Sequence, residues 1–272
     1  MDNSSRWQWM KDELQQLGEQ SQLRRMVPTS IGEDGWLVRE GRRMLNLASN
    51  HYLGLPLLPA QELSQQADSS SEVEGRRANE GATASRLIVG SDPIYAAFEA
   101  EFAAFKETEA SLVFGSGYTA NVGIISALMG RHDAVFSDRL NHASIVDGIT
   151  LSRARHVRYR NRDMEHLEYL LKQAEPSRRK LIVTDSVFSM DGSIAPLQEL
   201  VRLKERYQAM LMVDEAHSGG VYGAEGQGLV HELGLSRAVD IQMGTFSKAY
   251  GSYGAYAAGD HILINYLVNK SR

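Results

Sequence analysis

The chain has 272 residues, 43% of them hydrophobic and 23% charged, and its 29 Lys and Arg against 34 Asp and Glu give a formal charge of −5. This balance excludes a basic surface for a nucleic-acid backbone. The sequence contains no cysteine, which excludes disulfides, thiolate zinc sites and cysteine nucleophiles. No apolar run approaches the ~20 residues of a membrane span, and no signal-peptide pattern opens the chain. The composition therefore predicts a cytoplasmic globular protein without nucleic-acid or membrane partners.

The first third of the chain predicts a helix, a hairpin, a loop and a second helix. Apolar residues recur at helical spacing from Trp7 to Met26. Two apolar runs at 36–38 and 44–48, on either side of a glycine, indicate a short hairpin. The polar, Ser-rich stretch 65–79 predicts a loop. Asp92-Pro93 then opens a helix that extends to about Lys106, because Asp caps helices and Pro suits their first position.

The rest of the chain alternates between short apolar strands and helices. This alternation predicts a mostly parallel sheet with helices on both faces. Ligands of such sheets bind at the carboxyl ends of the strands, so the residues after each strand are the candidates for chemistry. The predicted strands are 112–114, 134–137, 156–159, 181–184, 210–213 and 241–243, and the predicted helices are 118–129, 164–174, 197–207 and one that begins near 261.

The first strand end with candidate residues carries the string Phe114-Gly-Ser-Gly-Tyr-Thr-Ala-Asn121, which leads from a strand into a helix. Free amides at a helix start, with no side chain at Gly117, suit a phosphate group. The string also fits the dinucleotide pattern through Gly115, Gly117 and Ala120, with Asp138 at a suitable distance along the chain. A tight turn without a ligand is the third reading.

Three further strand ends carry polar side chains. His142 could stack on a flat ring or exchange protons, or it could simply cap a helix. Asp214 directly follows a buried strand and needs a cation, with His217 three residues on; a helix cap and a metal pair are the alternatives. After the last strong strand, the hydroxyl of Thr245 could bind phosphate and Lys248 could attack a carbonyl, although a lone lysine is usually a surface charge.

Pyridoxal phosphate is the cofactor that uses all four strand ends. It has a phosphate, a flat ring, a pyridine nitrogen that an aspartate keeps protonated, and an aldehyde that a lysine captures. A nicotinamide dinucleotide would use only the first strand end. The combination therefore favours pyridoxal phosphate, with a nicotinamide-dependent dehydrogenase as the competing prediction.

The same residues carry a family resemblance. The sequence resembles the α-oxoamine synthases, which are fold-type I pyridoxal-phosphate enzymes. The resemblance implies an aspartate-aminotransferase-like α/β large domain at 49–272, preceded by an N-terminal helix and short hairpin at 1–48, and a homodimer. The matching strings, in chain order, are 46–55, 81–87, 114–121, 138–144, 187–192, 213–217 and 245–248.

The resemblance also implies roles for the residues at the cofactor ring. Lys248 would form the internal aldimine and later move the α-proton of the substrate. Asp214 would pair with the pyridine nitrogen. His217 and Ser189 would hydrogen-bond the phenolic oxygen of the ring, and His142 would stack on its face.

At the edge of the ring, the resemblance implies that Gly117, Tyr118 and Thr245 hold the phosphate. Arg24, which follows the N-terminal helix, would meet the acyl substrate; as a residue in its own right, it is equally a cation favoured at a helix C-terminus.

The implied reaction is a decarboxylating condensation of an amino acid with an acyl thioester. The strings 137–142 and 191–196 are most similar to bacterial members that join L-alanine to a pimeloyl thioester, of CoA or a carrier protein, in biotin biosynthesis. Members that use glycine and acetyl-CoA rank second. Family members continue into a small C-terminal domain, so the end at Arg272 predicts a fragment or a truncated, inactive chain. A catalytically silent subunit on the same fold is the third alternative.

Overall fold

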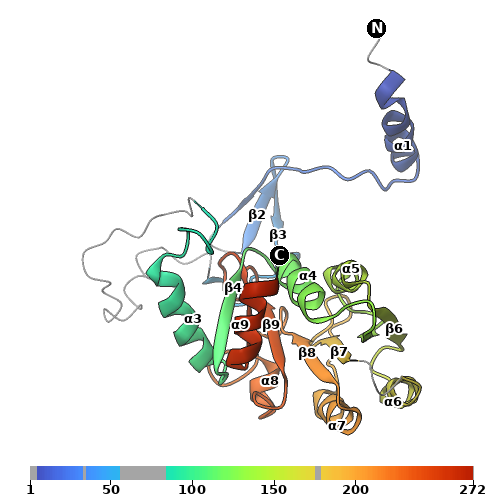
Figure 1. Cartoon of the computed structure of the whole chain (residues 1–272). Coiled ribbons are helices and arrows are strands. Elements are labelled where there is room, and N and C mark those ends of the chain that lie inside the picture. Colours follow the sequence, from blue (N-terminus) through green and yellow to red (C-terminus); the bar gives the residue numbers. More distant parts are fainter. Residues whose placement is uncertain (1–4, 33–34, 56–83, 175–178, 272) are drawn as a thin grey trace. The chain divides into compact units, whose positions relative to one another are not determined.

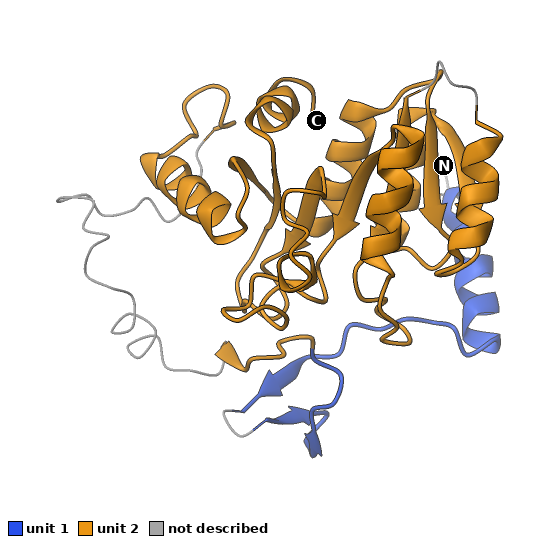
Figure 2. Cartoon of the chain, turned by 90° about the horizontal axis from the view of Figure 1, so that it is seen from below, with its two compact units in different colours: residues 1–49 blue, residues 50–272 orange. Residues whose placement is uncertain are grey.

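A computed structural model describes residues 5–32, 35–55, 84–174 and 179–271. The chain divides into two compact units, 1–49 and 50–272 (Figure 2). The loop predicted at 65–79, and the first three residues of the string 81–87, lie outside the described residues.

The described residues of the first unit form two helical segments and a small antiparallel sheet of order β1-β2-β3. The helix predicted from Trp7 to Met26 ends earlier than expected, because the chain leaves helical geometry at Ser21, whose φ is 57°. The predicted hairpin is present. A third strand, β1, pairs with it; its short Thr-Ser-Ile sequence carried no signal of a strand. The elements are η1 (Ser5–Trp7), α1 (Gln8–Glu19), β1 (Thr29–Ile31), β2 (Trp36–Arg39) and β3 (Arg42–Leu45).

The second unit is built on a seven-stranded sheet of order β4-β10-β9-β8-β7-β5-β6. The strands from β9 to β6 run parallel, and β10 is antiparallel to both of its neighbours. The prediction of a mostly parallel α/β sheet is therefore confirmed. The strands are β4 (Ala110–Phe114), β5 (Ala134–Asp138), β6 (Arg155–Tyr159), β7 (Lys180–Asp185), β8 (Met210–Asp214), β9 (Ile241–Thr245) and β10 (Ala255–Gly259).

Strand β10 was not predicted from the sequence. Its residues, Ala-Tyr-Ala-Ala-Gly, include no β-branched side chain, and Ala and Gly are depleted in strands. Small residues fit here because the strand is buried between β4 and β9. A Cβ atom at Gly259 would lie 2.5 Å from the Asp240 carbonyl oxygen.

Helices cover both faces of the sheet (Figure 1). One hydrophobic core joins α4, α5 and α9 to the sheet, and the other joins α6, α7 and α8 to the opposite face. None of the described helices is long and apolar enough to cross a lipid bilayer. The helices are α3 (Pro93–Phe105), α4 (Gly117–Leu128), α5 (Ala143–Ser152), α6 (Met164–Lys172), α7 (Leu197–Tyr207), α8 (Leu229–Glu232) and α9 (His261–Lys270).

Candidate active site at the carboxyl ends of the strands

The carboxyl ends of β7, β8 and β9 lie side by side, and those of β8 and β9 are two of the four strand ends singled out in the sequence. Asp185 at the end of β7 lies opposite Asp214 at the end of β8, and Asp214 lies opposite Met243 of β9. Side chains alternate between the faces of a strand. Asp214 therefore lies on the same face as Met212, which belongs to the core under α4 and α5. The candidate site is formed between this edge of the sheet and the first turns of those two helices.

Asp214 is 5% exposed, and both of its carboxylate oxygens accept hydrogen bonds. The backbone amide of Ala216 donates to Oδ1 at 2.9 Å. Asn121 of α4 donates from Nδ2 to Oδ2 at 2.8 Å. Two donors fix the orientation of the carboxylate.

Asn121 also connects Asp214 to His142. Its Nδ2 group donates to Ser144 Oγ at 2.9 Å, and Ser144 Oγ lies 2.7 Å from His142 Nδ1. Asn121 is 1% exposed, whereas the His142 side chain is exposed, so this chain of bonds leads from the buried carboxylate to an open imidazole. We did not predict a role for Asn121. Its spacing was the available signal, since residue 121 lies one helical turn after Gly117, on the same side of the helix.

Lys248 and His217 are in direct contact. Lys248 Nζ lies 2.8 Å from His217 Nε2, and His217 Nδ1 lies 2.7 Å from the Tyr52 hydroxyl. Tyr52 in turn donates to Asn50 Oδ1 at 3.3 Å. Burial, the nearby Lys248 charge and His142 lower the pKa of His217 to about 4. The imidazole is therefore neutral at pH 7, and it can accept from Lys248 while it donates to Tyr52.

Burial also lowers the pKa of Lys248, against the opposing charges of Asp214 and Asp185. A larger share of this lysine is consequently an unprotonated amine near neutral pH than would be expected for an exposed lysine. An unprotonated amine is the form that attacks a carbonyl. Tyr52, whose pKa burial raises, was quoted in the sequence only as part of the string 46–55. Its contact with His217 spans 165 positions of the chain, and no local pattern could have predicted it.

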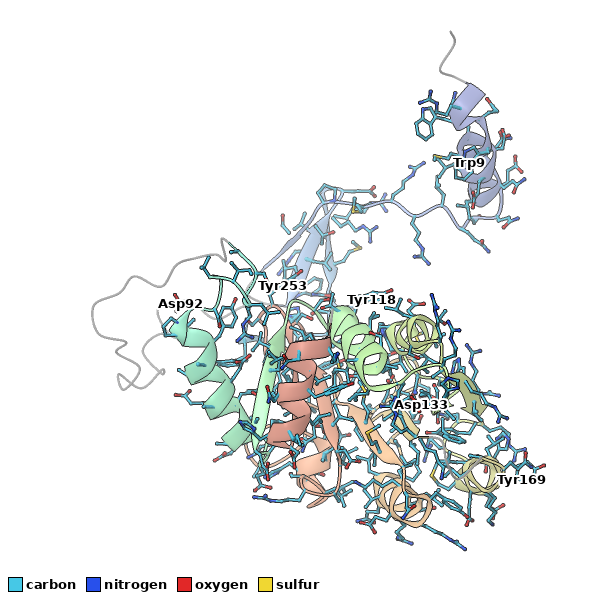
Figure 3. All side chains as sticks on the ribbon, viewed as in Figure 1. Trp9, Asp92, Tyr118, Asp133, Tyr169 and Tyr253 are labelled. Atoms are coloured by element: carbon cyan, nitrogen blue, oxygen red, sulfur yellow. The ribbon has the colours of Figure 1, made fainter. Side chains whose placement is uncertain are left out.

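The first turn of α4 lies against the end of β9. A Cβ atom at Gly117 would be 3.5 Å from Met243 Cε and 3.6 Å from Thr245 Cβ. Ser116 caps the helix and accepts from the amide of Thr119, which leaves the amides of Gly117 and Tyr118 for a ligand. The Tyr118 hydroxyl donates to Asp147 of α5 at 3.0 Å, so Tyr118 (Figure 3) offers its backbone to this turn rather than its ring.

Two of the predicted site residues, Ser189 and Arg24, have no role that the structure of the second unit tests. Ser189 is exposed in the turn between the bridged residues Val187 and Ile194. Arg24 lies in the first unit, just beyond α1, with an exposed side chain. Their roles remain predictions.

The order of the strands excludes the interpretation of the string 114–121 as a dinucleotide-binding turn. A dinucleotide fold needs its glycine-rich turn and its acidic residue on neighbouring strands. Here β4 and β5 are separated by β10, β9, β8 and β7. Asp138 is 2% exposed and already accepts from the Leu140 amide, the Asn161 side chain and the Arg162 amide. It is therefore not available to a ribose. The described residues also contain no cluster of three or more His, Asp or Glu that could hold a metal ion.

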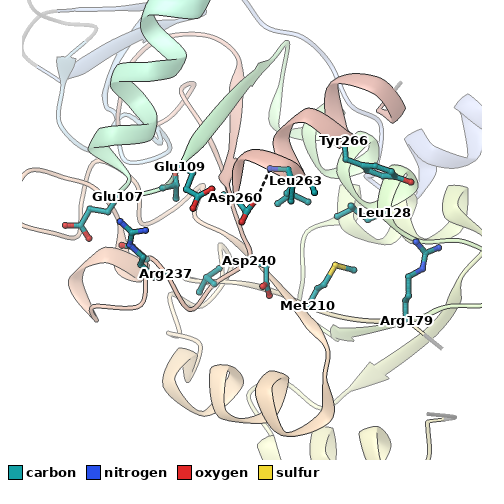
Figure 4. Close-up of a pocket in the computed structure, with 15 residues that line it drawn as sticks. Glu107, Glu109, Leu128, Arg179, Met210, Arg237, Asp240, Asp260, Leu263 and Tyr266 are labelled. Atoms are coloured by element: carbon teal, nitrogen blue, oxygen red, sulfur yellow. Dashed lines mark hydrogen bonds between the residues drawn. The ribbon is translucent and has the colours of Figure 1, made fainter. Parts of the chain in front are cut away.

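A separate cavity of about 570 Å³ lies at the opposite edge of the sheet (Figure 4). Its lining residues Met210 and Asp240 stand at the amino ends of β8 and β9, and Glu109 immediately precedes β4. Lys248 follows the carboxyl end of β9. This cavity is therefore distinct from the candidate active site.

Comparison with known proteins places the chain in a family. Residues 42–272 match the family Aminotransferase class I and II. The chain belongs to this family. It is also 58% identical, over 264 residues, to a protein of Halalkalibacterium halodurans named "Putative 8-amino-7-oxononanoate synthase", and 55% identical to a protein of the same name from Bacillus cereus. Each alignment covers 97% of this chain and 65% of the relative, so the chain spans about two-thirds of the length of these relatives.

Solved structures give the same assignment. A serine palmitoyltransferase from S. paucimobilis with a bound PLP-myriocin aldimine has a TM-score of 0.83 and 30% identity, over 100% of this chain and 67% of that one. An 8-amino-7-oxononanoate synthase from Francisella tularensis has a TM-score of 0.63 and 30% identity, over 82% of this chain and 60% of that one. The predicted family resemblance and the predicted fold type are confirmed.

Proposed function

We propose that the protein is a pyridoxal-phosphate-dependent acyltransferase that condenses L-alanine with a pimeloyl thioester. The products would be 8-amino-7-oxononanoate, carbon dioxide and a free thiol, as in biotin biosynthesis. The observation that carries the proposal is the contact between Lys248 Nζ and the neutral imidazole of His217, next to the hydrogen-bonded carboxylate of Asp214. The names of the similar proteins support the choice of substrates.

The residues present fit pyridoxal phosphate. The exposed imidazole of His142 offers a flat face for the ring, and Asp214 offers a fixed carboxylate for the pyridine nitrogen. The free amides at the start of α4, beside Thr245, suit the phosphate. When bound, the cofactor supplies an aldehyde and an electron-withdrawing ring that stabilises negative charge on the α-carbon of an amino acid.

The side chains of this protein would act in the following way. Lys248 Nζ would hold the cofactor through its aldehyde, and, once free, the amine would take the α-proton of the amino acid. His217, which contacts the amine of Lys248 through Nε2 in this structure, would exchange that contact for the phenolic oxygen of the bound cofactor and would hold that oxygen together with Ser189. Asp214 stabilises a proton on the pyridine nitrogen through charge pairing. Arg24 binds the acyl substrate.

We also propose that the protein works as a homodimer. Apolar side chains are exposed together after the undescribed segment 56–83, on the stretch that leads into α3: Leu87, Ile88 and Val89 are 72%, 76% and 78% exposed. Contiguous exposed apolar surface of this kind marks interaction sites. Analytical ultracentrifugation should give twice the mass of the chain.

The substrate assignment is tested by a steady-state assay. The chain, loaded with pyridoxal phosphate, is offered alanine, glycine and serine against pimeloyl-, acetyl- and palmitoyl-CoA, with Lys248→Ala as the inactive control. We expect turnover with alanine and pimeloyl-CoA above all other pairs. Preference for glycine and acetyl-CoA would indicate 2-amino-3-ketobutyrate CoA ligase instead, and preference for serine and palmitoyl-CoA would indicate the activity named for the S. paucimobilis structure.

A further inference from the structure

The candidate site contains a second buried carboxyl group that the proposed roles do not use. Asp185 ends β7 and is 5% exposed, as is its neighbour Asp214 at the end of β8. The two residues are directly opposite each other in the parallel register. Leu181 and Val183 of β7 share a core with Met212 of β8, so alternation along the strands directs Asp185 and Asp214 to the same face of the sheet.

The two carboxyl groups have different hydrogen-bond partners. Asp214 accepts one hydrogen bond on each oxygen. Asp185 Oδ1 is fully buried and has no partner among the described residues. The backbone amide of His142 points at the Asp185 carboxyl and favours its charged form, but it is outweighed. A buried carboxylate oxygen without a donor is unfavourable, and binding a proton removes the charge.

Most of the surroundings of Asp185 raise its pKa. Burial is the largest influence and raises the pKa of Asp185 well above its ordinary value. Repulsion from Asp214 on β8 and from Asp138 on β5 raises it further, whereas the charge of Lys248 lowers it. Two neighbouring carboxylates cannot both ionise easily in a buried site, so one of them retains a proton.

We propose that Asp185 and Asp214 form a carboxyl pair that holds one proton, with Asp185 as the protonated member and Asp214 as the single negative charge that would face the pyridine nitrogen. Asp185 is then a positioning residue that acts through Asp214 and Lys248. It limits the negative charge beside Lys248 to one unit, so that the amine can lose its proton. This inference rests on the proposed function for its meaning, but the protonation state can be measured without the cofactor.

The first test is infrared spectroscopy of the cofactor-free chain at neutral pH, with ¹³C-labelled aspartate. We expect the carbonyl stretch of a protonated carboxyl, which is resolved from the carboxylate bands, and we expect Asp185→Asn to remove it. The matched control is Asp138→Asn, because Asp138 is equally buried and close but has three donors; this change should leave the band in place. A labelled wild-type chain without the band overturns the proposal whether or not the variants fold.

The second test uses the visible band of pyridoxal phosphate attached to Lys248. Asparagine has the shape of a protonated aspartic acid and no charge. If Asp185 is neutral, Asp185→Asn shifts the pH midpoint of the band by less than about 0.5 unit. If Asp185 is ionised, the substitution removes a charge beside Lys248 and lowers the midpoint by about one unit or more, which contradicts the proposal. Failure of the wild-type chain to attach the cofactor would refute the proposed function instead, while the infrared result would still decide the protonation of Asp185.

Discussion

Two lysines contact the segment from Asp214 to His217, and they differ in burial and in the charge of their partners. Lys106, at the end of α3, has no exposed surface, and its Nζ lies 2.5 Å from Glu215 Oε2 and also donates to the Gln227 carbonyl. Lys248 is partly exposed, and its Nζ lies 2.8 Å from Nε2 of the neutral His217 ring. A lysine in a buried ion pair is a structural cross-link, whereas a lysine held by a neutral imidazole is available to react.

The structural lysine stabilises the segment that carries the reactive groups. Glu215 Oε1 accepts from the Val230 amide at 2.9 Å and from Ser218 Oγ at 3.1 Å, so the ion pair joins three separate stretches of chain. Gly228 approaches so closely, with a φ of 113°, that a Cβ atom there would lie 2.5 Å from Glu215 Oε1. Asp214 and His217 flank this anchored residue. Lys106 therefore anchors the segment from Asp214 to His217 through Glu215, while His217 of the same segment contacts the reactive Lys248.

The largest effect should come from breaking the buried ion pair. Lys106→Met leaves Glu215 buried and unpaired, which should lower the free energy of unfolding by about 3–5 kcal/mol. Adding Glu215→Gln removes the charge of the unpaired carboxylate and keeps an acceptor for the Val230 amide. The double variant should therefore recover part of the lost free energy of unfolding. Urea denaturation measures both.

The control for this comparison is the surface pair of Lys172 and Glu168, whose atoms lie 3.4 Å apart with the lysine 56% exposed. Lys172→Met should change the free energy of unfolding by no more than about 1 kcal/mol. Equal effects of Lys106→Met and Lys172→Met would contradict the structural role of Lys106.

A smaller effect is expected for Asn121→Ala, which removes a donor from the Asp214 carboxylate. A hydrogen bond to a charged group contributes about 1.5–3 kcal/mol, so the dissociation constant of pyridoxal phosphate should rise by about 10- to 100-fold. Fluorescence titration of the cofactor-free chain measures this. Asn265→Ala, at an exposed position of α9, is the control and should bind as the wild type does. Unchanged affinity in Asn121→Ala would show that the carboxylate does not need this donor.

The lowered pKa of Lys248 predicts reactivity at lower pH. A group with a depressed pKa loses its proton earlier as the pH rises, so acylation of Lys248 should reach half of its maximal rate below about 10.4, the value of an ordinary lysine. Peptide mapping after brief labelling at several pH values measures the rate. The same lysine in the urea-unfolded chain is the control and should return to the ordinary midpoint. Identical midpoints in the folded and unfolded chain would exclude an activated amine.

The smallest effect should follow Tyr52→Phe, which removes the hydroxyl next to His217 Nδ1. Loss of one hydrogen bond of about 0.5–1.5 kcal/mol should slow cofactor attachment by about 2- to 10-fold without lowering the melting temperature. Stopped-flow absorbance follows the attachment. A rate equal to that of the wild type would remove Tyr52 from the site.

Much of the fold could be predicted because its strands and helices have clear local patterns. Each predicted strand of the large sheet is present within one or two residues, since short apolar runs between helices identify buried parallel strands. Strand β10 could not be found in this way because its alanines and glycine do not distinguish a strand from a loop.

The site could be predicted where one segment carries its own signal, as at Lys248 and Asp214. The supporting residues lie far along the chain from what they contact: Asn121 is 93 positions from Asp214, and Lys106 is 109 positions from Glu215. These contacts form only in the folded chain, and no spacing in the sequence could predict them. From the sequence alone, Lys106 is indistinguishable from an ordinary surface lysine at the end of a helix.

The measurement that tests the contrast between the two lysines most directly is borohydride reduction of the chain loaded with pyridoxal phosphate, followed by peptide mapping. We expect the cofactor to be fixed on Lys248 and Lys106 to remain unmodified, with the yellow colour lost on reduction. Lys248→Ala should abolish the adduct. An adduct on Lys106 or on another lysine, or no adduct on Lys248 in the folded chain, would contradict the assignment of Lys248 as the reactive lysine.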